Sequence, residues 1–213
     1  MVQFLGDSGN KIFSLNGSLL KEKDPIPTTL GSRIDNKATV VGVLQDHEGN
    51  DYVLAVVDAA YRSSSAMAWS SEQVDTPLQN DVTQANALAD HHSGKYNTDL
   101  ILSTYTATDY PAFNFARNAC SVTFNGVTYY SVLPNYNEIK YLFNNKDVLD
   151  QYDPTVEDYN SRSMSEFKCG GTYGLWSSTE WGPSTAWCDK DVYFMKDNNN
   201  MCGVCPVICI PLS

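Results

Sequence analysis

The stretch Leu175-Trp176-Ser177-Ser178-Thr179-Glu180 decides the fold class of this chain. Its short run of apolar and small hydroxyl side chains is typical of a strand that packs one face in a core. Two more strand-like runs follow, at residues 186–195 and 204–210, and the polar residues 197–200 predict a turn between them. We therefore expect the C-terminal part of the chain to form an antiparallel sheet.

Two further pairs of strands are expected nearer the N-terminus. Residues 38–44 and 52–57 are rich in β-branched side chains and are separated by a polar turn at 46–50. Residues 121–124 and 127–130 flank Asn125-Gly126, a pair that readily adopts the positive φ angles of a tight turn. Both patterns predict antiparallel hairpins.

Three segments have the pattern of helices. Residues 80–90 carry apolar side chains at helical spacing behind an Asn-Asp start, and residues 111–120 begin with Pro, which suits a first helical turn. Residues 135–143 begin with the capping residue Asn135 and place Ile139, Leu142 and Phe143 on one face. Helices combined with antiparallel hairpins predict an α+β fold. A long polar loop is expected at 146–168.

The first 37 residues differ from the rest of the chain. They contain short polar and apolar pieces, and Pro25 and Pro27 exclude a helix interior or a central strand. We expect residues 1–37 to form an N-terminal arm, which either anchors or oligomerises the protein or simply packs as a strand on the domain. Residues 38–213 are expected to form one domain.

The charge of the chain excludes several classes of partner. There are 25 acidic and 14 basic residues, for a net charge of -11, and no Lys/Arg cluster offsets it. We therefore expect binding neither to nucleic acid nor to anionic membranes. No apolar run is long enough to cross a bilayer. The N-terminal residues lack the basic and apolar regions of a secretory signal, so no signal peptide is expected.

Four segments resemble, in the same order, signatures of bacterial and phage C-type-lectin-fold domains, a family that includes the C-terminal domain of Legionella collagen-like adhesins. Residues 132–139 (VLPNYNEI) resemble its LPS-x-x-EL helix start, and residues 175–180 (LWSSTE) resemble its YWSSTE strand. Residues 186–194 resemble its AW-x-V-x-F strand, and residues 204–207 (VCPV) its closing VRPV strand. The resemblance runs from about residue 111 to the end, and more loosely from residue 38.

This resemblance implies a C-type-lectin-like fold, with two or three helices packed on twisted antiparallel sheets and the first and last strands paired. Separately from the resemblance, we expect Trp176 in the core and Trp181 at the surface. Cys205 stands where the family has Arg, and Cys188 interrupts the Ala-Trp strand, so no binding residues are carried over from the family. The calcium-binding motifs of animal lectins are absent, and we expect no calcium-dependent sugar site.

The cysteines permit two interpretations. Disulfides and reduced, buried thiols both fit an even number clustered near the C-terminus. Cys202 and Cys205 have CxxC spacing, but no matching second pair accompanies them, so a zinc site is not expected. The three histidines are too few to favour a metal site over ordinary surface roles, and we expect no metal or cofactor. The six cysteines are Cys120, Cys169, Cys188, Cys202, Cys205 and Cys209.

The sequence contains no catalytic motif with the expected spacing. There is no Gly-x-Ser-x-Gly elbow and no phosphate-binding glycine loop. We therefore expect a binding protein and not an enzyme. Aromatic rings beside carboxylates suit contacts with sugars or proteins, and such residues follow the quoted strand. The candidate ligand-binding residues are Trp181, Trp187, Asp189, Asp191 and Tyr193.

These expectations combine into a phage head or tail fibre or decoration protein, made in the host cytoplasm and carried on the virion surface. Its N-terminal arm would contact other virion proteins and form a homotrimer, and its domain would contact host or mucosal glycans or proteins. One alternative is a bacterial cell-surface adhesin domain. Another is an enzyme of the formylglycine-generating type, which would use paired cysteines such as Cys202 and Cys205.

Overall fold

The computed structural model describes residues 12–13, 19–20, 24–89, 92–145 and 174–212, which combine helices with mostly antiparallel sheets. The α+β class expected from the sequence is confirmed. The long loop expected at 146–168 and Cys169 lie outside the described residues.

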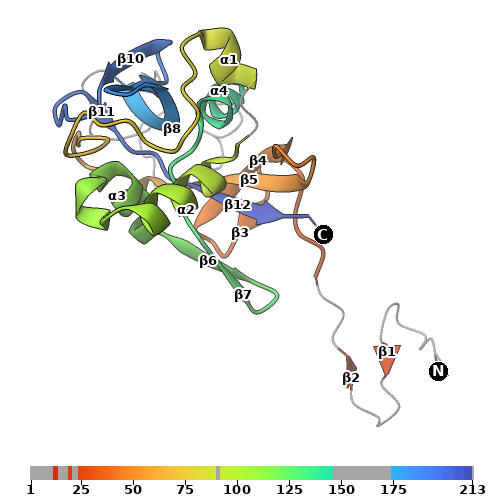
Figure 1. Ribbon diagram of the computed structural model, residues 1–213. Coiled ribbons are helices and arrows are strands. Elements are labelled where there is room, and N and C mark those ends of the chain that lie inside the picture. The colour runs from red at the N-terminus through yellow and green to blue at the C-terminus, as the bar shows by residue number, and fades with distance from the viewer. Residues whose placement is uncertain (1–11, 14–18, 21–23, 90–91, 146–173, 213) are drawn as a thin grey trace, which may run out of the picture.

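The first large sheet joins the two ends of the domain. Its strand order is β12-β5-β4-β3, and every neighbouring pair is antiparallel. The strands are β3 (Arg33–Ile34), β4 (Ala38–Gln45), β5 (Asp51–Val57) and β12 (Val207–Pro211). Figure 1 shows the blue C-terminal strand β12 beside the orange hairpin of β4 and β5. The hairpin predicted at 38–57 is confirmed. Its second strand, β5, pairs with the last strand, β12.

The folded domain includes part of the segment 1–37. Strand β3 pairs with β4, and the side chain of Ile34 is buried in the core of this sheet. The Arg33 guanidinium donates two hydrogen bonds of 2.6 Å to the carboxylate of Asp58, which fixes β3 to the end of β5. Strand β3 lies before the predicted boundary between residues 37 and 38, so this part of the segment 1–37 packs as a strand on the domain, which is one of the two alternatives expected.

A separate short ladder precedes the domain. Strands β1 (Ile12–Phe13) and β2 (Leu19–Leu20) pair antiparallel, with Ile12 opposite Leu20. Whether this ladder anchors or oligomerises the protein stays a prediction.

The helices are α1 (Gln84–Ala89), α2 (Gly94–Thr104), α3 (Pro111–Ala119) and α4 (Tyr136–Asn144). Single 3₁₀ turns lie at Ala59–Tyr61 and Ala107–Asp109. Helices α3 and α4 match the sequence prediction, whereas α1 is shorter than the predicted segment 80–90 and α2 was not predicted. No helix of the described residues is long and apolar enough to span a bilayer.

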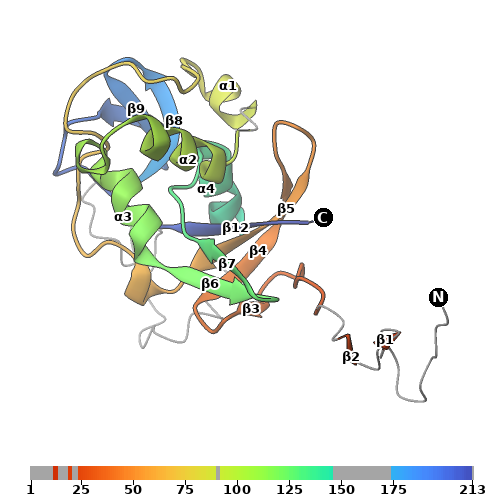
Figure 2. The same ribbon diagram turned by 60° about the horizontal axis from the view of Figure 1, so that its bottom comes forward.

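The hairpin predicted around Asn125-Gly126 is confirmed. Strands β6 (Ser121–Phe124) and β7 (Val127–Tyr130) pair antiparallel, and Asn125 and Gly126 have φ angles of 51° and 78°. Figure 2 shows this hairpin extending below helix α3, beside the sheet that contains β3 and β4.

The second large sheet contains the stretch quoted at the outset. Its strand order is β10-β9-β8-β11, with β11 parallel to β8 and the other pairs antiparallel. The strands are β8 (Gly174–Gly182), β9 (Thr185–Cys188), β10 (Val192–Met195) and β11 (Cys202–Gly203). The strand predicted at 186–195 is two strands, and the one predicted at 204–210 is shorter and begins at Val207. The predicted turn at 197–200 lies between β10 and β11.

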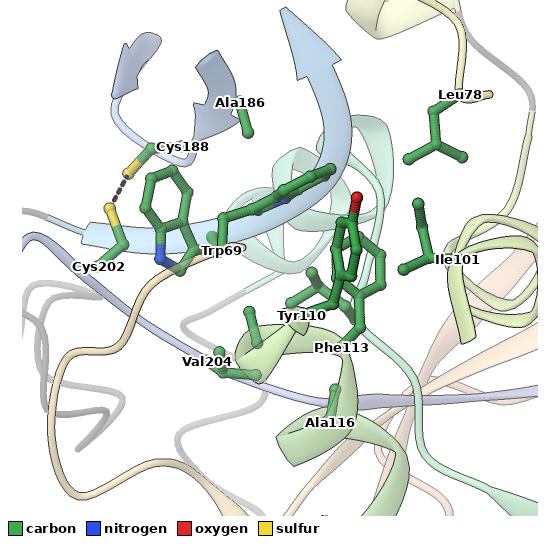
Figure 3. Close-up of a cluster of buried hydrophobic side chains, with 13 residues drawn as sticks. Trp69, Leu78, Ile101, Tyr110, Phe113, Ala116, Ala186, Cys188, Cys202 and Val204 are labelled. Atoms are coloured by element: carbon green, nitrogen blue, oxygen red, sulfur yellow. Dashed lines mark hydrogen bonds between the residues drawn. The ribbon is translucent and has the colours of Figure 1, made fainter. Parts of the chain in front are cut away.

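A buried aromatic cluster fills the space between this sheet and helices α2 and α3. The rings of Trp69 and Phe113 meet edge to face with centroids 4.8 Å apart, as Figure 3 shows. The indole N–H of Trp69 donates to the carbonyl oxygen of Ser177 at 2.8 Å, and that of Trp176 to the carbonyl oxygen of Met67 at 2.7 Å. Trp176 is fully buried, so its predicted place in the core is confirmed.

One buried carboxylate connects helix α4 to two other parts of the fold. Asn135 and Glu138 form a capping box at the start of α4, with reciprocal hydrogen bonds of 2.6 and 2.8 Å. Glu138 also accepts hydrogen bonds from the hydroxyl of Tyr52 on β5, at 2.7 Å, and from the backbone N–H of Gly94, at 3.1 Å. The cap predicted at Asn135 is confirmed, and its partner Glu138 also orients α4 on the first sheet and on α2.

Candidate functional site

Three of the predicted site residues meet on one face of the second sheet. Tyr193 on β10 lies directly opposite Trp187 on β9, with ring centroids 6.0 Å apart in an edge-on arrangement. The ring of Tyr193 stacks on that of Trp181 from β8, with centroids 4.2 Å apart and planes 19° from parallel. We call these three side chains the aromatic face. The sequence predicted its members, and the strand register explains why they meet.

The members of the aromatic face differ in exposure. Tyr193 is 46% exposed, Trp181 is half-buried, and Trp187 is only 4% exposed. The indole N–H of Trp187 donates to the backbone oxygen of Asp81 at 2.7 Å, and its ring packs on Tyr136 with centroids 5.0 Å apart. The prediction that Trp187 offers its ring to a ligand is therefore wrong. Trp187 supports Tyr193 from below, and Trp181 and Tyr193 form the accessible surface.

The turn between β9 and β10 places its two aspartates differently. Asp189 is buried, where its Oδ1 accepts a hydrogen bond of 2.9 Å from the N–H of Leu175 and one of 3.0 Å from the thiol of Cys188. Its Oδ2 has no hydrogen-bond partner among the described residues. Burial raises the pKa of Asp189, although these two hydrogen bonds act to lower it. Asp189 therefore does not belong to the accessible surface, contrary to the prediction.

Asp191 lies at the edge of the aromatic face and is half-exposed. It occupies the left-handed region with a φ of 61°, and its carboxylate accepts hydrogen bonds from the ammonium of Lys140 and the hydroxyl of Tyr136. Partial burial acts to raise the pKa of Asp191, but these hydrogen bonds outweigh it and the pKa is lowered. The structure thus places one ionised carboxylate beside the ring of Tyr136, which the sequence did not connect with this site.

Strand β10 adds apolar surface at the edge of the sheet. Val192 is 39% exposed and Met195 is 48% exposed, on either side of Tyr193. Among the described residues β10 pairs on one side only, with β9. A planar aromatic stack beside an unpaired strand edge and a carboxylate can contact the apolar face of a sugar ring or an aliphatic side chain of a protein.

The cysteines form a pair that the sequence did not single out. The Sγ atoms of Cys188 and Cys202 lie 3.2 Å apart in the buried aromatic cluster, as Figure 3 shows. Cys205, which the CxxC spacing pairs with Cys202, instead packs with Cys209 in the core of the first sheet. The CxxC spacing that suggested Cys202 and Cys205 as a pair therefore places the two thiols in different clusters.

Histidines from two distant segments also meet. The rings of His47, in the turn between β4 and β5, and His92, just before α2, have centroids 4.4 Å apart. The ring of Tyr96 lies within 4.9 Å of both. Within the part of the chain that the structure describes, no three His, Cys, Asp or Glu side chains are grouped so that they could hold a metal ion.

Comparison of this chain with known protein families, with curated proteins and with solved structures finds no match.

Proposed function

We propose that this chain is a non-enzymatic binding protein with a C-type-lectin-like fold, displayed on the surface of a phage particle. Its ligand is a glycan or protein of the host surface or the mucosa. The observation that carries the binding role is the stack of Trp181 on Tyr193, which is open to solvent and backed by buried Trp187. Rigid, partly exposed aromatic rings offer a large contact area at little cost in side-chain entropy.

The strand pairing supports the lectin-like part of the proposal. The last strand, β12, pairs with β5 of the N-terminal hairpin over five residues, from Val207 opposite Val56 to Pro211 opposite Tyr52. The stretch that resembles the family's Trp-Ser-Ser signature lies in a second, smaller sheet, and the stretch that resembles its helix start begins α4. The resemblance implied that the first and last strands pair; the last strand instead pairs with β5, the second strand of the N-terminal hairpin, so that the two ends of the domain still meet in one sheet.

The residues expected to contact the ligand, Trp181 and Tyr193, are distinct from the buried residues that hold them in place. This arrangement favours binding over catalysis. Lys196 directly follows β10 and Glu180 lies on β8, and their fully buried ion pair links these two of the three strands that carry the aromatic face. Fixed strands under a small exposed aromatic surface suit a ligand that is recognised without rearrangement. In this proposal the N-terminal arm is the part of the chain before Asp24, because Asp24, Ile26 and Leu30 already contact the domain, and the arm attaches the domain to other virion proteins as a homotrimer.

Two experiments test this proposal. Immunogold labelling of purified virions with antibody to the folded domain is expected to mark the particle surface, and unlabelled particles would contradict the virion location. A panel of bacterial surface polysaccharides, mucin glycans and host-surface proteins is then screened for binding to the full chain. We expect at least one saturable ligand whose binding is lost in Trp181→Ala and Tyr193→Ala variants and retained in Tyr130→Ala. Tyr130 is the matched control because it is 59% exposed and lies on the β6–β7 hairpin.

A further inference from the structure

One pocket in the surface contains none of the residues of the aromatic face. It is a pocket of about 320 Å³ between the segment that begins at Ser70 and the connection from helix α2 to helix α3. The N–H of Ser71 donates to the carbonyl oxygen of Asp109 at 2.7 Å, so the two walls are joined by a backbone hydrogen bond. Its volume lies in the range of small-molecule sites in proteins, which begins at roughly 300 Å³.

The charged side chains that line this pocket are all acidic. Its lining includes the carboxyl groups of Glu72, Asp75 and Asp109 and no Lys, Arg or His. Among the described residues, the carboxylates of Glu72 and Asp109 have no hydrogen bond or ion pair, whereas Asp75 accepts one hydrogen bond of 3.2 Å from Asn80. The nearby Lys196 is already bound, because its ammonium contacts Glu180 and donates to backbone oxygens. Asp75 interacts electrostatically with Lys196, whereas no cation of the described residues neutralises the carboxylates of Glu72 and Asp109.

A buried polar atom without a partner provides a second, independent indication. Tyr110 lines the pocket and is only 2% exposed, yet its hydroxyl makes no hydrogen bond of standard geometry with a described residue and interacts only with the side chain of Tyr105 among its neighbouring tyrosines. Figure 3 shows this hydroxyl at the end of the ring that points away from helix α3. Burial, followed by the influence of Tyr105, raises the pKa of Tyr110 to about 12, so the phenol stays neutral. A buried hydroxyl without a partner costs free energy, which a ligand that hydrogen-bonds to it recovers.

The walls of the pocket also suit a positive charge. The rings of Tyr105 and Tyr110 lie with centroids 4.8 Å apart and planes inclined by 37°. The negative faces of such rings attract ammonium and guanidinium groups. The three carboxylates are not grouped closely enough to hold a metal ion, and they surround a space that is larger than one ion requires.

We propose that this pocket binds an organic cation, an ammonium or guanidinium group on a short alkyl stem. Glu72 and Asp109 neutralise its charge, the hydroxyl of Tyr110 accepts one of its N–H groups, and the ring of Tyr105 lies beside its stem. Free amines and the lysine or arginine side chains of a polypeptide share this chemistry. The site is separate from the aromatic face and does not depend on the function proposed above.

Titration of the full chain with defined probes tests this site. The probes are n-butylammonium chloride, a blocked Gly-Lys-Gly peptide and, as the neutral control, 1-butanol, followed by calorimetry and by the NMR signals of the tyrosine rings. We expect saturable binding of butylammonium, no saturable binding of butanol, and affinity that falls as salt is added. Binding of the peptide as well would identify a polypeptide as an acceptable source of the cation, and its failure to bind would restrict the site to free amines. Absence of saturable binding by both cations would overturn the proposal.

Variants locate the site. The exposed acids Glu72 and Asp109 can be changed in the double variant Glu72→Gln/Asp109→Asn without disturbing a contact, and we expect at least about a tenfold loss of butylammonium affinity. Tyr110→Phe removes only the hydroxyl and is expected to lose affinity while its Tm is unchanged or higher. Glu48→Gln, at an exposed acid of the β4–β5 turn, is the control and should bind as wild type. Equal binding by the double variant and wild type would overturn the assignment, whereas the Trp181→Ala variant should keep this binding whether or not the proposed function holds.

Discussion

Lys196 and Glu180 form an ion pair in which both side chains are completely buried. The Lys196 ammonium also donates to the carbonyl oxygens of Val74, at 2.7 Å, and Pro183, at 2.8 Å, and it lies 4.8 Å from the ring centroid of Trp69. Glu180 accepts a further hydrogen bond of 2.6 Å from the Thr76 hydroxyl. Burial lowers the pKa of Lys196 to about 7, and the charge of Asp75 acts against this shift. These contacts join the loop that carries Trp69 to strands β8 and β10, which carry Trp181 and Tyr193.

Removing one member of this pair should be more costly than removing both. We expect Lys196→Met to lower the free energy of unfolding by about 3–5 kcal/mol, because the charge of Glu180 is left buried without its cation. The double variant Lys196→Met/Glu180→Leu should recover most of that loss. Lys95→Met, which removes an exposed i,i+4 pair with Asp99, should cost less than about 0.5 kcal/mol. Urea denaturation measures all three, and a double variant as unstable as Lys196→Met would contradict this role.

Gly94, the first residue of α2, is enclosed by the start of α4. A Cβ added here would lie 2.4 Å from the carbonyl oxygen of Leu133 and 2.6 Å from Oε2 of Glu138. We expect Gly94→Ala to destabilise the protein by about 1–3 kcal/mol or more, because neither neighbour can move without breaking the capping box. Gly182→Ala is the matched control, since its nearest neighbour would lie 3.8 Å away, and it should change stability by less than about 1 kcal/mol. Equal denaturation midpoints for the two variants would show that the close approach is unimportant.

The stability of the protein should depend on pH through Asp189. The folded protein raises the pKa of this carboxyl above its ordinary value of 3.8, so it retains a proton that the unfolded chain has already lost. Its contribution to stability is therefore complete below pH 3.8 and is lost as the pH rises through the folded pKa. Asp189→Asn has no ionisable group here and does not lose stability in this way. Between pH 3.8 and the folded pKa of Asp189, the free energy of unfolding of the variant relative to that of wild type should therefore increase by up to about 1.4 kcal/mol per pH unit.

Asp191→Asn provides the control of opposite sign. The pKa of Asp191 is lowered in the folded protein, so its contribution to stability is present above pH 3.8 and is lost as the pH falls through the folded pKa. Denaturation curves recorded over a pH series compare the variants. If the difference between Asp189→Asn and wild type is independent of pH, the description of Asp189 as a carboxyl destabilised by burial is wrong.

Much of the fold could be predicted because local chemistry decides it. Asn125-Gly126 fixes a tight turn, the capping pair Asn135 and Glu138 starts α4, and the β-branched run that begins at Ala38 forms a central strand. Asp191 illustrates what was missed. Its left-handed conformation divides one predicted strand into two, and no glycine marks the position in the sequence.

Helix α2 could not be predicted from hydrophobic periodicity because its buried face is largely polar. Asn97 donates to the Ser178 hydroxyl at 3.1 Å, and the hydroxyl of Thr98 accepts a hydrogen bond of 3.1 Å from the N–H of Leu133. At the candidate site, the aromatic composition was evident, but the burial of Trp187 depends on contacts with Tyr136 that lie far away in the sequence. Tertiary contacts of this kind leave no local pattern.

Oxidation should join Cys188 to Cys202, whose sulfur atoms lie 3.2 Å apart. With glutathione disulfide as oxidant, one S–S bond forms in the protein while two protons and two electrons reduce the oxidant to two thiols. The new bond closes a loop of about 15 residues and should stabilise the protein by about 3 kcal/mol. Mass spectrometry of the digested protein should recover the linked peptides, and Cys188→Ser should remove both the link and the gain in stability. Recovery of Cys202 linked to Cys205 instead would contradict the observed arrangement.

The central claim is that the stack of Trp181 and Tyr193 contacts the ligand. It is tested most directly by the equilibrium dissociation constant for the strongest ligand found among the bacterial polysaccharides, mucin glycans and host-surface proteins. We predict that Trp181→Ala and Tyr193→Ala each raise this constant by about tenfold or more, because each removes an aromatic contact surface, while Tyr130→Ala leaves it unchanged. If both variants bind that ligand as tightly as wild type and remain folded, the aromatic face is not the binding surface.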